Sequence, residues 1–209
     1  MAKAPDKPAD TDTGAAARDF FTAQALFSNP QLAFLYTDLL VHSPTTVTAA
    51  RERTETERST AYKYANELAE LGVAAETGDR EDGAALWRAE PVVGTWHGAA
   101  AFTLSPTVIA VYGASSRDDD LGLFCDRHGT SALAPAVAET LAYCRGEQTR
   151  RGVADALGVP AAEGIAVSQA IEGVVAVLAG VDPTLDPDTF EIEVHDRAIA
   201  DSPYTPADE

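Results

Sequence analysis

Five polar side chains recur with helical spacing in the N-terminal half of the segment 56–71: Arg58, Ser59, Tyr62, Lys63 and Asn66. Arginine and asparagine offer the paired donors and the amide that recognise base edges in a DNA groove. Hydroxyl and ammonium groups bind phosphate oxygens. A helix that exposes these five groups on one face therefore has the chemistry needed to bind the major groove of DNA.

The opposite face of the same segment is apolar and must be covered by other elements. Its side chains repeat at i, i+3, i+4 and i+7, which predicts a helix from about 56 to 71 that ends at Gly72. We expect a helix over 30–42 to cover it. A second, short helix over 45–50 should follow, with Ser43 as its N-cap and Pro44 at its first position. The apolar set is Ala61, Tyr64, Ala65, Leu68 and Leu71.

Two short strands are expected after Gly72. Val73 to Glu76 and Ala85 to Glu90 flank the loop TGDREDGA, which contains Gly78 and Gly83. The expected order is three helices followed by a two-stranded wing.

The stretch SPTTVTAARERTETERSTAYKYANELAELGVAAE resembles the winged helix-turn-helix of archaeal and bacterial transcription regulators. With its acidic composition, the chain is most similar to haloarchaeal members of that class. The resemblance implies a sequence-specific regulator that binds double-stranded DNA, with the helix at about 56–71 in the major groove. The DNA-binding residues that it implies are Thr45, Arg58, Ser59, Thr60, Tyr62, Lys63, Asn66 and, in the wing, Arg80.

A winged-helix adaptor that binds proteins and never contacts DNA is the alternative. The wing loop contains Asp79, Glu81 and Asp82 beside the single cation Arg80. Residues 43–76 hold six acidic and four basic side chains, a local charge of -2, so phosphate attraction is weak there.

The whole chain has a formal charge of -18, with twelve arginines and only three lysines. This composition is typical of cytosolic proteins from extreme halophiles, because molar salt reduces the Debye length to about 3 Å and screens self-repulsion. Nine acids and one cation fall in residues 177–209. At such salt, we expect specificity to depend on base contacts more than on phosphate attraction.

The predicted fold is mainly α with small β wings (α+β). We expect a disordered arm at 1–14, a winged helix-turn-helix at 15–92, a helical C-terminal domain at 93–197 and a disordered acidic tail at 198–209. In the C-terminal domain, Trp96 and Phe102 to Leu104 indicate a strand after a turn at His97 and Gly98, which can pair with 189–194. Ser105, Thr130 and Thr149 should cap helices. The turn at 154–159 suggests a second, degenerate winged helix. Its helix, 161–178, lacks Lys and Arg, and we assign it to self-association in a homodimer.

Enzyme chemistry is not expected. Cys125, Asp126 and His128 lie within four residues, but no phosphate loop or carboxylate pair accompanies them. The two cysteines, Cys125 and Cys144, indicate no disulfide or zinc site, so we predict no metal and no cofactor. A pocket for an unidentified small-molecule effector between the C-terminal helices remains open. No apolar run approaches about 20 residues, which predicts no membrane association and a cytoplasmic protein.

Overall fold

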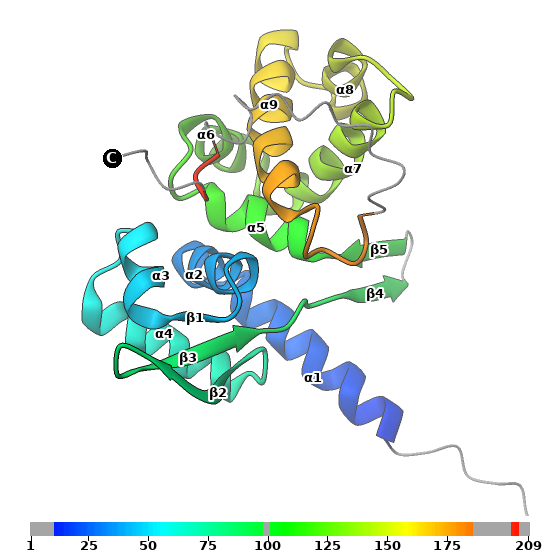
Figure 1. Cartoon of the computed structure of the whole chain (residues 1–209). Helices are drawn as coiled ribbons and strands as arrows, with labels where there is room; N and C mark the ends of the chain where they lie inside the picture. The colour runs from blue at the N-terminus through cyan, green and yellow to red at the C-terminus, as the bar shows by residue number, and fades with distance from the viewer. Residues whose placement is uncertain (1–10, 98–100, 186–201, 205–209) are drawn as a thin grey trace, which may run out of the picture.

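The computed structural model describes residues 11–97, 101–185 and 202–204. Within these ranges the chain is mostly helical, with two small antiparallel sheets, which agrees with the α+β class (Figure 1). The helices are α1 Thr11–Leu26, α2 Pro30–Val41, α3 Val47–Arg53, α4 Arg58–Glu70, α5 Pro106–Ala114, α6 Asp119–His128, η1 Thr130–Ala132 (a 3-10 turn), α7 Leu133–Cys144, α8 Arg150–Leu157 and α9 Ala161–Leu178. The strands are β1 Thr45–Thr46, β2 Ala74–Glu81, β3 Ala84–Ala89, β4 Gly94–His97 and β5 Ala101–Leu104.

The expected first helix is present as α2. The side chain of Asn29 accepts hydrogen bonds from the backbone N–H groups of Gln31 and Leu32, and Pro30 occupies the first turn. Both are strong local signals for a helix start. Nearly the whole of α2 is buried, so it forms the centre of the N-terminal half.

The expected start of the second helix is wrong. Ser43 does not cap it, because the chain first forms strand β1, in which Thr45 and Thr46 pair with Trp87 and Leu86 of β3. Thr46 is the N-cap of α3, and its hydroxyl accepts a 3.1 Å hydrogen bond from the backbone N–H of Ala49. Pairing with a strand some 40 residues away therefore moves the start of this helix from the position that Ser43 and Pro44 indicated to Val47.

Both expected strands are present: the first, expected at 73–76, extends over Ala74–Glu81, the second, expected at 85–90, is shifted by one residue to Ala84–Ala89, and most of the predicted loop is strand. Strands β2 and β3 form a hairpin that closes at Asp82 and Gly83, whose φ angles are 48° and 83°. Two consecutive positive φ angles are typical of the tight turn that an Asp-Gly pair favours. Pairing of β1 with β3 completes a three-stranded sheet of order β1-β3-β2.

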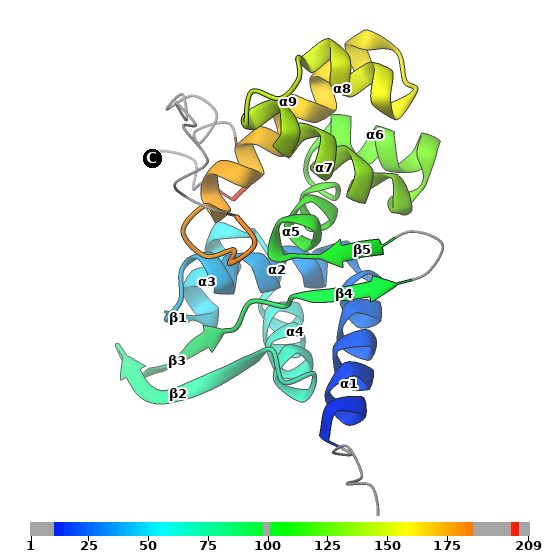
Figure 2. The same ribbon diagram turned by 90° about the vertical axis from the view of Figure 1, so that its right-hand side faces the viewer.

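The C-terminal half begins with a second hairpin, in which β4 pairs with β5. Its expected pairing with 189–194 stays a prediction. The latter residues lie outside the described ranges, as does the wing expected for a second winged helix. Helices α5 to α9 then pack as a bundle, which Figure 2 shows above the N-terminal half. Thr149 caps α8 as expected, whereas Thr130 begins η1 and does not cap α7.

Helix α9 is the core helix of this bundle. It has 18 residues and a mean hydropathy of 1.5, so by length and composition alone it is apolar enough to cross a membrane, which the sequence interpretation had not expected. In the structure it packs against α5, α6, α7 and α8. Part of the apolar helix that we assigned to self-association is therefore buried within the chain, and its role in a homodimer stays a prediction. Its buried residues are Gly164, Val167, Ser168, Ile171, Gly173, Val174, Val175 and Leu178.

Both expected disordered ends need partial correction. Helix α1 begins at Thr11, inside the arm predicted at 1–14, and extends away from the rest of the molecule (Figures 1 and 2). Its run of three alanines, 15–17, favours helix strongly enough to offset Gly14. Within the tail predicted at 198–209, Ser202 and Tyr204 are buried.

The two halves share one hydrophobic core, in which α2 packs along α5. Gly113 of α5 allows the backbone of Phe34 in α2 to approach closely. Tyr204 fills the same junction: its ring stacks on Phe34 with centroids 4.5 Å apart, and its hydroxyl donates a 2.7 Å hydrogen bond to the carbonyl of Ala110. The C-terminal half is therefore fixed against the helices that position α4.

Candidate nucleic-acid interface

Helix α4 presents one polar face outward and buries the other. Arg58, Tyr62, Lys63 and Asn66 are all exposed, whereas Ala61, Tyr64, Ala65 and Leu68 are buried against the core, as the spacing predicted. Leu71, expected in the buried set, is only half-buried. The guanidinium of Arg58 lies 6.0 Å from the ring centroid of Tyr62. The Tyr62 hydroxyl is 3.3 Å from that of Thr48, which joins the first turn of α3 to this face.

The start of α4 is occupied by an acidic side chain. Glu57 is the N-cap, and its carboxylate accepts hydrogen bonds from the Ser59 hydroxyl and from the backbone N–H of Thr60, the latter at 3.0 Å. These bonds, that from the Ser59 side chain first, lower the pKa of Glu57 to about 2. The carboxylate thus occupies the place at a helix N-terminus where a phosphate would bind. Ser59 and Thr60, both predicted to bind phosphate, are engaged by Glu57 in this structure.

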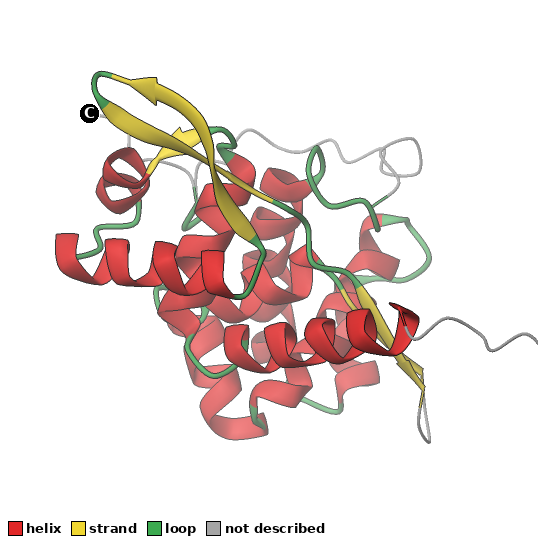
Figure 3. Cartoon of the chain, turned by 90° about the horizontal axis from the view of Figure 1, so that it is seen from below, coloured by secondary structure: helices red, strands yellow, loops and turns green. Residues whose placement is uncertain are grey.

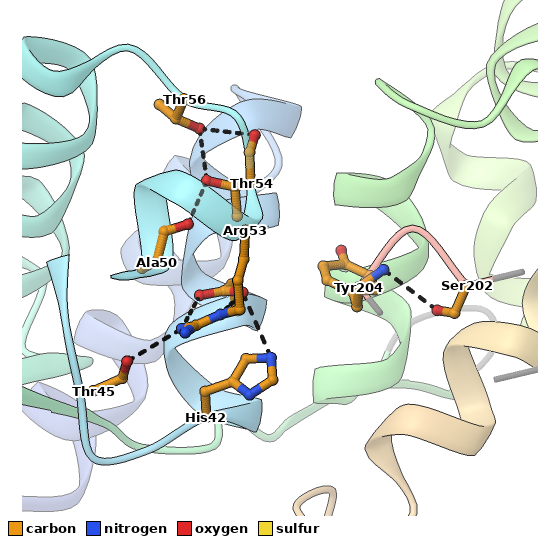
Figure 4. Close-up of polar contacts among 9 residues, drawn as sticks. His42, Thr45, Ala50, Arg53, Thr54, Thr56, Ser202 and Tyr204 are labelled. Carbon is orange, nitrogen blue, oxygen red and sulfur yellow. Dashed lines mark hydrogen bonds and ion pairs between the residues drawn. The ribbon is translucent and has the colours of Figure 1, made fainter. Parts of the chain in front are cut away.

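Thr45 is wrong as a DNA-binding residue. It is buried in β1, and its hydroxyl accepts a 3.2 Å hydrogen bond from Arg53 (Figure 4). Arg53 in turn donates two hydrogen bonds, of 2.9 and 2.8 Å, to the carboxylate of Asp38, which is only 1% exposed. The sequence could not show this pairing, because Asp38 lies on the preceding helix and its spacing resembles that of an ordinary exposed residue.

Two of the basic side chains near α4 are in ion pairs that the sequence did not reveal. Arg53 is neutralised by Asp38, and Arg51 lies 3.2 Å from Glu52. Among the four cations in residues 43–76, Arg58 and Lys63 form no ion pair within the described residues. Attraction to phosphates from this face is therefore modest.

The β2–β3 hairpin lies beside the helices at the opposite end of the molecule from the β4–β5 hairpin (Figure 3). Arg80 is exposed, and its guanidinium donates a 2.8 Å hydrogen bond to the carbonyl of Gly83, which holds it near the turn. Arg88 of β3 is also exposed, between buried Trp87 and Ala89. The alternation in LWRA was the signal for this second basic residue, which the sequence interpretation omitted.

A residue of the C-terminal half contacts the turn before α4. Arg117 donates one hydrogen bond to the carbonyl of Thr54 and another, of 3.3 Å, to the carboxylate of Glu55. Its guanidinium also lies 5.5 Å from the ring centroid of Phe34. No local pattern could have identified this residue, since its partners are more than 60 positions away.

Of the Cys125, Asp126 and His128 group on α6, His128 contacts α9. His128 Nε2 lies 3.0 Å from the carboxylate of Glu163, and burial raises the pKa of the Cys125 thiol. In the part of the chain that the structure describes, no three potential metal ligands gather.

A model of a family of unknown function, DUF7437, matches residues 115–179. This segment coincides with α6 to α9 and includes Arg117. No curated protein and no solved structure matches the chain. The helices and the hairpin around α4 lie outside the matched segment.

Proposed function

We propose that residues 30–90 form a winged helix-turn-helix, with α3 and α4 as the helix pair and the β2–β3 hairpin as the wing. The order α2, β1, α3, α4, β2, β3 and the sheet order β1-β3-β2 support this proposal. So does the tight turn between α3 and α4, where Glu55 has a φ of 47°. Helix α2 and β1 supply the support on which the pair rests.

We further propose that the protein is a sequence-specific DNA-binding transcription regulator. The observation that carries this is the exposed group Arg58, Tyr62, Lys63 and Asn66, on a helix whose other face is fixed in the core. With 13 residues, α4 is about 20 Å long, enough to reach base edges over its N-terminal half in the major groove. Arg58 and Asn66 bind base edges, Lys63 and Tyr62 bind phosphates or bases, and the wing cations Arg80 and Arg88 reach the neighbouring backbone.

The charge distribution indicates how such binding would work. The cations on the proposed face are few, and Glu57 occupies the helix N-terminus, so the non-specific phosphate contribution is small. In a halophilic cytoplasm that contribution is suppressed by salt in any case. Discrimination then comes from bidentate base contacts, each worth about 1–3 kcal/mol.

We propose that the regulator acts as a homodimer. A two-fold dimer would place its two α4 helices in successive major grooves, about 34 Å apart, on a palindromic site. One protomer alone, with four exposed contact residues on α4, reads too few base pairs to be selective in a genome.

Selection of DNA from a random double-stranded pool, at 0.2 M and 2 M KCl, tests the proposal. The expected result is one enriched palindromic motif at both concentrations. Asn66→Ala should relax one base position in each half-site and leave the others unchanged. If the wild-type protein enriches no motif at any salt concentration, the regulator proposal fails and a protein-binding adaptor becomes the better account.

A further inference from the structure

An apolar cavity of about 300 Å³ opens between the two halves of the chain, beside the β4–β5 hairpin. Its walls come from the residue that follows α1, from β5, from the start of α5, and from η1 and α7. The lining residues are Phe27, Phe102, Val108, Thr130, Ser131 and Ala134. This volume is at the lower end of the range of small-ligand pockets, about 300–1,000 Å³.

The cavity has a fixed floor and an exposed rim. Val108 is only 5% exposed and belongs to the core, and Phe27 packs on Tyr112 with ring centroids 5.1 Å apart. At the rim, Phe102 is 38% exposed and is held against Trp96 of the neighbouring strand, at a centroid distance of 6.2 Å. The floor is therefore preformed, and an occupant would remove an exposed aromatic ring from water.

The polar groups of the lining are confined to one side. Thr130 and Ser131, both exposed on η1, supply two hydroxyls, and the lining residues that the structure describes carry no charge. A charged ligand would lose hydration there without gaining a partner. An uncharged ligand gains apolar contact from Phe27, Phe102 and Val108, and one polar group can bond the hydroxyls.

From this lining we propose that the cavity binds a small, uncharged, mainly apolar molecule with one hydrogen-bonding group that faces Thr130 and Ser131. The site joins α7, inside the segment matched by DUF7437, to β5 and Phe27 outside it. This proposal adds the class of effector to the proposed function. Only an effect of the ligand on DNA binding rests on that function. Binding itself is measured without DNA, so failure of either proposal can be told from failure of the other.

Titration of the full chain with the fluorescent probe 6-propionyl-2-dimethylaminonaphthalene tests the site. The probe is uncharged, has a naphthalene ring and carries one carbonyl acceptor. We expect saturable binding at one site per chain with a blue shift of the emission. Ala134→Phe, which fills the cavity, should weaken binding at least tenfold. Ala138→Phe, one turn further along α7 at an exposed position, is the matched control and should bind as the wild type does.

Two further measurements separate loss of the site from loss of stability and test the preference for an uncharged ligand. Phe102→Ala removes a rim residue that the core does not need, and should weaken binding severalfold even if Ala134→Phe lowers stability. An anionic naphthalene sulfonate of similar size should bind at least tenfold more weakly than the uncharged probe. Equal binding by the wild type, Ala134→Phe and Phe102→Ala would overturn the proposal, as would preference for the anion.

Discussion

The Nη1 atom of Arg117, in the turn between α5 and α6, lies 3.3 Å from the carboxylate of Glu55, in the turn that precedes α4. A second hydrogen bond from Arg117 reaches the Thr54 carbonyl. Two elements far apart in the sequence are thus joined at the turn that sets the position of α4. The C-terminal half therefore contacts the turn that leads into the proposed recognition helix.

Arg117→Ala should weaken DNA binding by about three- to tenfold, equivalent to ~1 kcal/mol, because the turn loses two of its constraints. Amide hydrogen exchange at Glu55 and Thr56 should accelerate in parallel. Arg127→Ala removes an exposed arginine of α6 that pairs with Glu163, and serves as the control. Unchanged affinity together with unchanged exchange in Arg117→Ala would show that the contact does not position the turn.

Glu57→Gln should strengthen DNA binding. Glutamine keeps an oxygen that can accept from Ser59 and Thr60, but it removes the negative charge from the start of α4. Because the pKa of Glu57 is lowered to about 2, the wild-type side chain is charged at any pH of interest. One more phosphate contact would make the slope of log K against log salt steeper by about 0.9. Glu70→Gln, at the far end of α4, should leave affinity and slope unchanged; an equal gain in both variants would point to net charge alone.

The stability of the fold should fall between pH 7 and pH 5 through His42. Burial lowers the pKa of this imidazole below its ordinary 6.5, and its Nε2 lies 3.7 Å from the Asp38 carboxylate. Asp38 attracts a proton to His42, but burial, together with the positive charge of Arg53, outweighs this attraction. The unfolded chain thus binds the proton more readily than the folded chain, so stability is complete above about pH 6.5 and declines below it.

Denaturation midpoints at pH 8, 6.5 and 5 measure this effect. His42→Gln should flatten the profile over that range. A wild-type midpoint that rises as the pH falls would contradict the assignment.

Gly113→Ala should destabilise the junction of the two halves. A Cβ atom at this position would lie 2.7 Å from the backbone nitrogen of Phe34 and 2.8 Å from the Tyr204 hydroxyl. The crowding should cost about 1–3 kcal/mol in the free energy of unfolding, although alanine normally favours a helix by about 0.5–1 kcal/mol. Gly180→Ala, which meets open space, is the control. Equal stability of both variants in chemical denaturation would mean that α2 and α5 are not in close contact.

Much of the helical framework could be predicted from local signals. Asn29 with Pro30, Thr149 and Gly129 mark helix ends through hydrogen bonds or backbone angles that involve near neighbours, and the spacing of Ala61, Tyr64 and Leu68 identified the buried face of α4. Such features depend on a few consecutive residues. They survive in the folded chain because packing reinforces them.

The errors concern partners that lie far away in the sequence. Ser43 and Pro44 resemble a helix start, but pairing of Thr45 with Trp87 converts the next residues into a strand. Thr45 resembles a surface contact until Arg53 and Asp38 bury it. In the same way, the burial of Tyr204 depends on Phe34 and Ala110. The composition of the C-terminal tail gives no sign of these distant contacts.

The most direct test of the central claim measures the affinity of Arg58→Ala, Lys63→Ala for the selected DNA motif over a series of KCl concentrations. The control is Arg127→Ala, Arg145→Ala, which removes the same charge from the C-terminal surface. The account predicts that the α4 variant loses at least tenfold in affinity and that its salt slope becomes shallower by about 1–2. It also predicts that the control keeps both wild-type values. Equal affinities and slopes for the two double variants would contradict a DNA-binding role for α4.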